Sequence, residues 1–356
     1  MSARVLMTGN DAIGEAAIRA GCDCYYGYPI TPQNELTAYM AINMPRLGRV
    51  FIQAESEIAA INMVFGSAVA GKRAMTSSSS PGISLKQEGI SFLAGAELPA
   101  VIVNVQRGGP GLGNIAPAQG DYFQAVKGGG HGDYHVIVLA PDSVQEMFDL
   151  TFLAFDLADQ YRNPAMILTD GRLGQMMEPL VPGDGKPNIP PKPWALTGAA
   201  GRPPNMIRSL ILPEGELEEH NIRLQTKYAQ VGQAEVRFEE RWIDDCEVLM
   251  VAYGTSARIV KGALETARSR GIKAGMLRPI SLWPFPTERL RQLAARVHSV
   301  LVVEMSSGQM IQDVQLAVNG QAPVYFEGRM GGGVPTEAAV LAHLNKLSHE
   351  PVIVAP

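Results

Sequence analysis

The 356-residue chain has few of the side chains that hold metal ions. Its three cysteines, Cys22, Cys24 and Cys246, are too few and too unevenly spaced for a four-thiolate cluster or a structural zinc site. His131 and His135 lie near each other, but no pair of carboxylates stands at ligand spacing from them. We therefore expect no metal site in this chain, so any iron–sulfur chemistry would use clusters held by other chains.

The sequence also lacks long apolar runs and runs of basic residues. No stretch approaches the roughly 20 apolar residues of a membrane-spanning helix, and the first residues do not have the pattern of a signal peptide. A formal net charge of -5 without a basic cluster gives no support for a nucleic acid or an anionic membrane as partner. With 46% hydrophobic residues, 37 glycines and 25 prolines, the composition predicts a loop-rich globular protein of the cytoplasm.

Short strand-like runs alternate with helical patterns along the first half of the chain. This alternation is typical of a parallel sheet with helices on both faces. It predicts a doubly wound α/β domain over residues 1–178. The expected strands are 5–7, 50–52, 73–76, 100–105, 136–139 and 165–168.

Repeated prolines separate this region from a second alternation. Residues 179–241 contain Pro190, Pro191 and Pro193, followed by a charged, helix-prone stretch, and predict a proline-rich excursion and linker. Alternating runs between residues 248 and 318 then predict a smaller α/β domain over 242–356.

A loop near the start of the chain places a hydroxyl between two prolines. Proline fixes its own φ and restricts the residue before it, so Pro29 and Pro32 should hold Ile30 and Thr31 extended. The loop thereby presents the Thr31 hydroxyl. The alternative is an ordinary strand-to-helix turn with Thr31 or Asn34 as the helix N-cap.

Two carboxylates, Glu55 and Glu57, lie where a strand hands over to a helix. Interaction with the helix N-terminal dipole, with Ser56 as the N-cap, accounts for one of them. The other needs a different explanation, which makes this segment a candidate site.

Polar residues also follow two later strands. Hydroxyls from Ser77 to Ser80 come after the strand at 73–76, at the edge where open α/β sheets bind ligands. Arg107 ends the strand at 100–105 and is followed by a glycine-rich loop. An arginine there can hold a carboxylate through two parallel N–H bonds, and glycines let the backbone approach a ligand. The alternative for Arg107 is an ordinary structural ion pair.

A nucleotide-binding protein is a weaker interpretation of the turn from Gly9 to Gly14. A phosphate-binding loop has Lys and then Ser or Thr after its last glycine, whereas this chain has Glu15 and Ala16. Because a carboxylate repels phosphate, the motif favours a tight strand-to-helix turn.

Taken together, these motifs resemble the α subunit of the 2-oxoacid:ferredoxin oxidoreductases, over essentially the whole chain. Other segments are most similar to the 2-oxoisovalerate, or branched-chain, branch of the family. The family motifs are 28–32, 56–57, 76–82 and 106–110, and the branch segments are 121–124, 127–133, 161–164 and 174–179.

The resemblance implies a division of labour between chains. This chain would form the pyrimidine-binding domain of a thiamine-diphosphate-binding fold, followed by a transketolase C-terminal-like domain. A separate β subunit would hold the diphosphate and Mg²⁺. A ferredoxin-like δ subunit and, in many members, β would hold the [4Fe–4S] clusters, and a γ subunit would be a further partner. The implied reaction is coenzyme A-dependent oxidative decarboxylation of a 2-oxoacid, with ferredoxin as electron acceptor.

The resemblance also assigns roles to the candidate residues. Glu57 matches the glutamate that hydrogen-bonds N1′ of the aminopyrimidine, which leaves Glu55 to the helix dipole. Thr31 and Arg107 match the positions that hold the carbonyl and the carboxylate of the substrate. Further candidates are Pro29, Ile30, Ser79 and Ser80 for the cofactor, and Gly111 and Asn114 for the substrate.

Two alternatives to the branched-chain function remain open. The same chemistry could act on 2-oxoglutarate or pyruvate, and a second cation for a distal carboxylate would favour 2-oxoglutarate. A non-catalytic scaffold subunit is the other alternative. The presence of Glu57, Thr31 and Arg107 argues against it.

Overall fold

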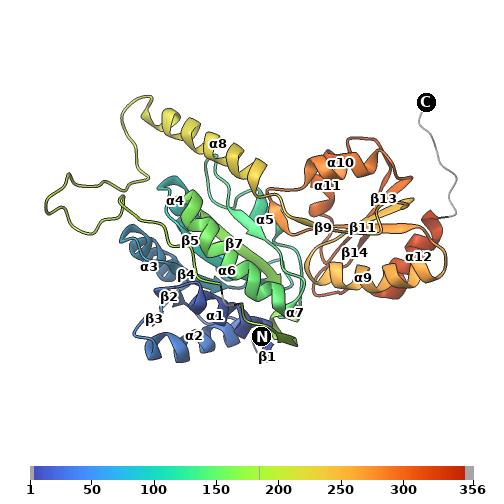
Figure 1. The fold of residues 1–356 in the computed structure, drawn as a ribbon, viewed down its shortest axis with the longest axis horizontal. Coiled ribbons are helices and arrows are strands. Elements are labelled where there is room, and N and C mark those ends of the chain that lie inside the picture. The colour runs from blue at the N-terminus through green and yellow to red at the C-terminus, as the bar shows by residue number, and fades with distance from the viewer. Residues whose placement is uncertain (1–3, 184, 349–356) are drawn as a thin grey trace.

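The computed structural model describes residues 4–183 and 185–348. It shows a larger N-terminal lobe and a smaller C-terminal lobe side by side, each built around a sheet with helices packed against it (Figure 1). Among the described residues, no helix combines the length and apolar character needed to cross a membrane.

The larger domain is built on a seven-stranded sheet in the order β12-β6-β7-β5-β4-β2-β3. Every pairing in it is parallel except that of β12 with β6, in which Ser281 lies opposite Leu139. The strands are β2 (Cys24–Gly27), β3 (Val50–Gln53), β4 (Ala74–Ser78), β5 (Ala100–Gln106), β6 (Ile137–Leu139), β7 (Pro164–Asp170) and β12 (Ser281–Trp283).

Helices cover both faces of this sheet. Along β5, Ile102 packs into the core shared with α3 and α4, and its neighbours Val101 and Val103 pack into the core shared with α1, α2 and α6. This alternation follows from the period of two along a strand. It confirms the doubly wound architecture. The helices are α1 (Gly9–Arg19), α2 (Asn34–Arg46), α3 (Glu57–Val69), α4 (Ser80–Gly95), α5 (Tyr122–Val126), α6 (Val144–Tyr161) and α7 (Gly171–Gln175).

One strand expected in this sheet lies outside it. Residues 5–7 belong to β1 (Val5–Thr8), which pairs antiparallel with β8 (Met177–Leu180) in a separate two-stranded ribbon. The sheet instead contains β2 between β4 and β3. Residues 9–14 lie within α1, so they do not form a phosphate loop.

The smaller domain has a five-stranded sheet in the order β14-β13-β10-β11-β9. Its strands are parallel except for the edge strand β9. The elements are β9 (Phe238–Arg241), β10 (Val248–Val251), α9 (Gly254–Ser269), β11 (Ala274–Pro279), α10 (Thr287–Ala294), β13 (Ser299–Glu304), α11 (Met310–Val318), β14 (Val324–Gly328) and α12 (Glu337–Leu347).

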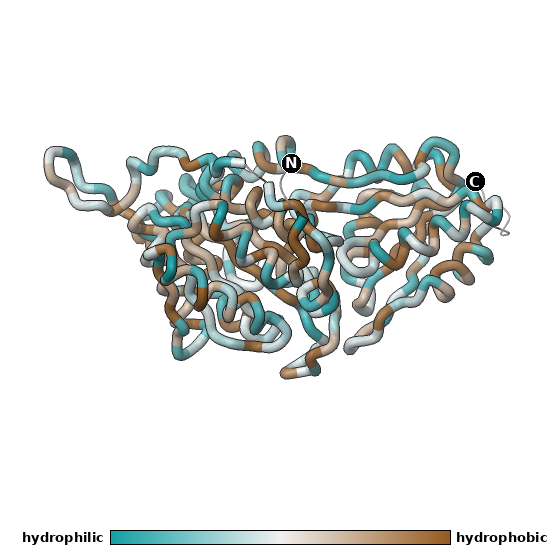
Figure 2. The backbone as a smooth tube through the Cα atoms, turned by 60° about the horizontal axis from the view of Figure 1, so that its bottom comes forward, coloured by the Kyte–Doolittle hydropathy of each residue, from teal (hydrophilic) through white to brown (hydrophobic). Residues whose placement is uncertain are grey.

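The proline-rich segment projects from the larger domain as a loop before α8 (Glu216–Ala234), as Figure 1 shows, and the same loop extends to the left in Figure 2. Between β8 and α8, the described residues form neither helix nor strand. The predicted ranges 1–178, 179–241 and 242–356 remain predictions, and residues 1–3, 184 and 349–356 of them lie outside the described residues. Within 179–241, β9 pairs with β11 of the smaller sheet.

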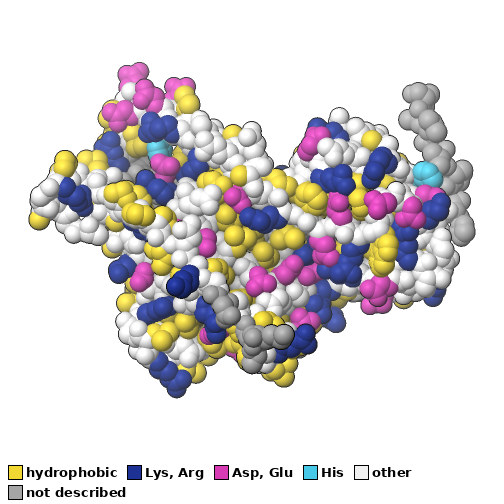
Figure 3. Space-filling model, viewed as in Figure 1, with side chains coloured by type: hydrophobic (Ala, Val, Ile, Leu, Met, Phe, Trp, Pro, Cys, Tyr) yellow, Lys and Arg dark blue, Asp and Glu magenta, His cyan; other side chains and the backbone are white. Residues whose placement is uncertain are grey.

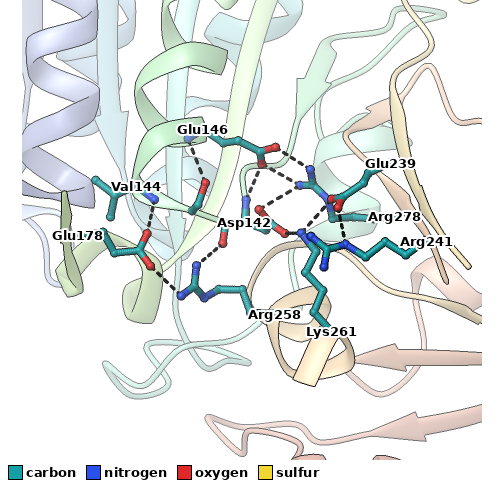
Figure 4. Close-up of polar contacts among 10 residues, drawn as sticks. Asp142, Val144, Glu146, Glu178, Glu239, Arg241, Arg258, Lys261 and Arg278 are labelled. Carbon is teal, nitrogen blue, oxygen red and sulfur yellow. Dashed lines mark hydrogen bonds and ion pairs between the residues drawn. The ribbon is translucent and has the colours of Figure 1, made fainter. Parts of the chain in front are cut away.

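A cluster of ion pairs joins the two domains around Arg278, and charged side chains gather at the junction of the lobes (Figures 3 and 4). Arg278 has a side chain only 2% exposed, and its guanidinium donates to both oxygens of Glu146, at 2.8 and 2.6 Å, and to Glu239 at 2.8 Å. Beside it, Lys261 bridges Asp142 and Glu239. Since Glu146 and Asp142 belong to the larger domain, this cluster ties the smaller domain to it.

Candidate active site

Four chain segments meet at one edge of the larger sheet. Strands β2, β4 and β5 are neighbours and run parallel, so the segments that follow them start at the same edge. These segments carry Thr31, Ser79 with Ser80, and Arg107. The fourth segment follows β3 and leads into α3, where Glu57 stands.

Glu57 is the first residue of α3 and is only 6% exposed. Ser56 caps the helix by accepting a hydrogen bond from the Ala59 amide at 3.2 Å, as predicted. A Cβ placed on Gly82 would lie 2.4 Å from Glu57 Oε1 and 2.0 Å from Ser78 Oγ, so the carboxylate lies against the first turn of α4, beside the Ser78 hydroxyl.

No described residue donates a hydrogen bond to this carboxylate. The hydroxyls of Ser78 and Ser79 and that of Thr76 are also buried without a described partner. Buried polar groups normally have hydrogen-bond partners. This edge of the sheet therefore presents an acceptor and several hydroxyls that a bound molecule can satisfy.

Glu55 lies before the N-cap of α3 and is exposed. The acidic residue in the first turn of the helix is Glu57 itself. The expectation that Glu55 serves the helix dipole is therefore wrong, because the helix begins two residues later.

Arg107 ties two loops together. Its guanidinium donates to the carbonyl of Thr31 at 3.0 Å and to the carbonyl of Leu112 at 2.9 Å, and its Nε is buried without a described partner. Within the described residues it forms no ion pair with an acid. The alternative of an ordinary structural ion pair is therefore wrong.

A chain of hydrogen bonds through Ser80 to Asp121 holds the backbone of Arg107 in place. The Arg107 amide donates to Ser80 Oγ at 3.0 Å, and Ser80 Oγ donates to Asp121 Oδ2 at 2.6 Å. Asn104 Nδ2 also donates to this carboxylate, at 2.9 Å. Burial raises the pKa of Asp121, and the hydrogen bonds from Ser80 and Asn104 oppose part of that rise. Ser80 is thus engaged within the chain, whereas the Ser79 hydroxyl is unpartnered.

The loop that carries Thr31 is held in place by the hydrogen bond from Arg107 to the Thr31 carbonyl and by the packing of Pro32 against Gly171. The Thr31 hydroxyl accepts a hydrogen bond from Asn34 Nδ2 at 3.2 Å, and a Cβ on Gly171 would lie 2.8 Å from Pro32 Cγ. The N-cap of α2 is Gln33, without a side-chain capping bond. The alternative of Thr31 or Asn34 as the N-cap is therefore wrong, because the helix begins at Asn34.

The remaining candidates differ in their surroundings. Pro29 is exposed and Ile30 half-buried in the same loop. Gly111 is exposed, with a positive φ of 69°. Asn114 donates to the carbonyl of Gly331 at 2.9 Å, so it joins the loop after β5 to the smaller domain.

Two groups near this edge were not among the sequence candidates. Asp121 stands in a segment matched to the family, but nothing in its spacing indicates that it lies behind Arg107. Lys86 is fully buried on α4, and its Nζ lies 3.4 Å from the Glu57 carbonyl oxygen. No group of three or more His, Cys, Asp or Glu positioned for a metal ion occurs among the described residues.

The fold and this edge define a class of protein, the thiamine-diphosphate-binding α/β proteins with a second, transketolase-like domain. The family model "Pyruvate flavodoxin/ferredoxin oxidoreductase, thiamine diP-bdg" matches residues 15–200, and the model "Pyruvate:ferredoxin oxidoreductase core domain II" matches residues 246–340. The chain belongs to the 2-oxoacid:ferredoxin oxidoreductase family, as an α-type subunit. The family predicted from the sequence is confirmed.

Curated relatives cover nearly the whole chain. The ketoisovalerate oxidoreductase subunit VorB of Methanothermobacter thermautotrophicus is 55% identical over 96% of this chain and 97% of its own length. The 2-oxoglutarate synthase subunit KorA of Archaeoglobus fulgidus is 39% identical over 87% of this chain and 90% of its own.

Solved structures agree with the fold. The 2-oxoglutarate:ferredoxin oxidoreductase of Magnetococcus marinus, solved with 2-oxoglutarate, coenzyme A and succinyl-CoA bound, matches with a TM-score of 0.88 at 26% identity. The match covers 97% of this chain and 65% of that one. A split-gene transketolase in an inactive β4 tetramer matches 96% of this chain and 98% of its own with a TM-score of 0.60 at 15% identity, which supports the fold alone.

Proposed function

We propose that this chain is the α subunit of an enzyme that oxidatively decarboxylates a 2-oxoacid. The assembled enzyme converts the 2-oxoacid and coenzyme A to acyl-CoA and CO₂ and passes the electrons to ferredoxin. The observation that carries the proposal is the buried Glu57 carboxylate, which has no described donor and lies beside the unpartnered Ser78 hydroxyl in a domain of this family.

The residues around Glu57 fit the aminopyrimidine of thiamine diphosphate. Glu57 would hold the ring by accepting a hydrogen bond from it at N1′, and the low dielectric of a buried site would strengthen that charge-assisted bond. The Ser79 hydroxyl and the loop at Pro29 and Ile30 would supply the other contacts with the cofactor. When bound, thiamine diphosphate supplies the decarboxylation chemistry, and the protein orients it.

Arg107 and Thr31 bind the 2-oxoacid. The Arg107 guanidinium keeps an unpartnered Nε and its positive charge for the substrate carboxylate. The Thr31 hydroxyl accepts a hydrogen bond from Asn34 and keeps its hydrogen to donate to the substrate carbonyl. Because Arg107 also holds the Thr31 backbone, both groups are ordered before substrate binds, which reduces the entropy lost on binding. Gly111 and Asn114 lie farther along the loop that follows Arg107 and are further candidates for contact with the substrate.

The other parts of the enzyme come from partner chains. A β subunit binds the diphosphate and Mg²⁺, and β and the ferredoxin-like δ subunit carry [4Fe–4S] clusters, with a γ subunit completing the complex. The relatives that match nearly the full chain are themselves named as subunits, and coenzyme A is bound in the related solved structure. We place the assembly in the cytoplasm.

The proposed substrate is a branched-chain 2-oxoacid, 2-oxoisovalerate. The relative at 55% identity is named for ketoisovalerate, which supports this choice. 2-Oxoglutarate is the second candidate, because the loop that accepts a hydrogen bond from Asn114 also carries the exposed cation Arg329. Such a cation suits a distal carboxylate.

A substrate panel on the reconstituted complex tests the proposal, with ferredoxin reduction as readout. We expect 2-oxoisovalerate to have the highest kcat/KM, ahead of pyruvate and 2-oxoglutarate. A preference for 2-oxoglutarate would overturn the substrate assignment, and reduction of ferredoxin by none of the three would overturn the function itself.

A further inference from the structure

Helices α3 and α4 pack unusually closely along one pair of faces. On α4, Gly82, Lys86 and Gly89 are spaced by four and three residues, so they share one face. A Cβ on Gly82 would lie 2.4 Å from Glu57 Oε1, and one on Gly89 would lie 2.6 Å from Ile61 Cγ2. The two glycines therefore let α3 approach the backbone of α4, with Lys86 between them.

A buried lysine such as Lys86 is unusual in a helix–helix interface, here the seam between α3 and α4. Its side chain is fully buried, and its one described hydrogen bond goes from Nζ to the Glu57 carbonyl oxygen at 3.4 Å. Among the described residues it forms no ion pair within 4.0 Å. A buried ammonium without a paired carboxylate is costly, so packing alone gives no reason for a lysine here.

The charged groups around this seam are few. Glu57 is the only charged residue of α3, and strands β4 and β5 contain none. On α4 the other charged residue is Glu88, which is exposed. Asp121 lies beyond Ser80, and Asp170 ends β7. Burial lowers the pKa of Lys86 to about 8, and the charge of Glu57 opposes part of that fall.

We propose that Lys86 is a positioning residue for Glu57: its ammonium donates to the Glu57 carbonyl at the start of α3 and places a positive charge near the Glu57 carboxylate, with which it forms no ion pair within 4.0 Å. The inference rests on the proposed function of Glu57 in holding the aminopyrimidine. Lys86 touches neither cofactor nor substrate and acts through Glu57. Because a nearby positive charge disfavours uptake of a proton by the Glu57 carboxylate, Lys86 would shift the pH range in which the site binds the cofactor, and it would do so through Glu57 alone.

The test measures the affinity of the assembled complex for thiamine diphosphate by calorimetry as a function of pH. Lys86→Gln removes the charge but keeps a donor for the Glu57 carbonyl, and Lys86→Met removes both. We expect both variants to move the whole pH profile to higher pH by about one unit, since protonation becomes easier without the cation. A profile that weakens without moving would overturn the inference.

Melting temperature separates this role from a packing role. An apolar side chain of similar length should suit a buried seam better than an unpaired ammonium, so we expect the Tm of Lys86→Met to equal or exceed that of the unaltered complex. A fall in Tm together with an unmoved pH profile would show that Lys86 is only structural.

Three further variants complete the design: Lys227→Gln, Glu57→Gln and the double variant Glu57→Gln with Lys86→Gln. Lys227, partly buried on α8 and paired with Glu97, is the matched control, and Lys227→Gln should leave the pH profile unmoved.

In a Glu57→Gln background, adding Lys86→Gln should give no further shift of the pH profile. If Glu57→Gln alone binds thiamine diphosphate and decarboxylates normally, the proposed function fails. If Glu57→Gln is inactive but Lys86→Gln leaves the profile in place, only the Lys86 inference fails.

Discussion

At the scale of single residues, Arg107 has two roles: we propose that it binds the substrate carboxylate, and its hydrogen bonds hold two loops in place. Its Nη atoms hold the carbonyls of Thr31 and Leu112, and its amide is fixed by Ser80. The side chain therefore cannot swing away from the edge of the sheet. A fixed guanidinium suits a carboxylate better than a mobile ammonium does.

We expect Arg107→Ala to raise KM and lower kcat for the 2-oxoacid in the reconstituted complex. Loss of a charge-assisted hydrogen bond and of the ordered Thr31 loop should reduce kcat/KM by roughly 10- to 100-fold or more. Steady-state kinetics of ferredoxin reduction measure the change.

Arg107→Lys is the matched variant, because it keeps the charge but cannot make both carbonyl contacts. It should recover part of the loss in KM and little of the loss in kcat. An unchanged kcat/KM in Arg107→Ala would remove Arg107 from the substrate site.

The positions of these residues were predictable from the sequence only in part, for a physical reason. Ser80 and Arg107 follow the predicted parallel strands at 73–76 and 100–105, so their convergence at one edge could be expected. Thr31 follows β2, which the sequence did not predict, so its place beside them could not. Lys86 was missed because a lysine in a helix is normally exposed. Its burial depends on two glycines seven residues apart and on a second helix, which no local pattern encodes.

At the scale of elements, the close approach of α3 and α4 sets the position of Glu57. Gly82 leaves the space that the carboxylate and the Ser78 hydroxyl fill. Helix–helix distance is thus part of the geometry of the site.

We expect Gly82→Ala to displace the Glu57 carboxylate. The added methyl would lie 2.0 Å from Ser78 Oγ and 2.4 Å from Glu57 Oε1, so one of the two must move. Overpacking of this kind costs about 1–3 kcal/mol, and we expect thiamine diphosphate to bind about tenfold more weakly. Calorimetric titration of the complex measures the affinity.

Gly66→Ala on the exposed side of α3 is the control. Nothing lies within 4 Å of a Cβ there, and alanine in a helix is favoured over glycine by about 0.5–1 kcal/mol. It should raise the Tm slightly and leave binding unchanged. Equal affinities in the two variants would contradict the role assigned to Gly82.

Element prediction failed where local pattern and tertiary pairing disagree. The apolar run at 5–7 forms a strand, but β1 pairs with β8 instead of joining the main sheet. The four residues of β2, Cys-Tyr-Tyr-Gly, are too short to show a period, yet they pair with two strands. Which strand pairs with which depends on the folded chain, so it cannot be predicted from the residues of one strand alone.

At the scale of the whole molecule, the ion pairs around Arg278 contribute to holding the two domains together. Burial alone would raise the pKa of Glu239, but Lys261, Arg241 and Arg278 lower it to about 2, from an ordinary value of 4.5. A carboxyl group with a depressed pKa in the folded state stabilises the fold above its unfolded pKa and loses that contribution as pH falls toward its folded pKa.

We therefore expect the chain to lose stability as pH falls from about 4.5 to about 2, and Glu239→Gln to lose less over this range. Urea unfolding at pH 5 and pH 3 measures the difference. Glu88→Gln, at an exposed position, should behave like the unaltered chain. An identical pH dependence in Glu239→Gln would show that the cluster does not govern acid stability.

The crossing of β12 into the larger sheet limits how the polypeptide can be divided. This strand comes from residues 281–283, beyond the start of the second sheet, yet it closes the β6 edge of the first. A fragment that ends in the proline-rich segment would lack β12, so the backbone donors and acceptors along the edge of β6 would be exposed. Such an exposed edge can pair with a strand of another molecule. The N-terminal half alone therefore cannot form its complete sheet, and synthesis must pass residue 283 before that sheet can be completed.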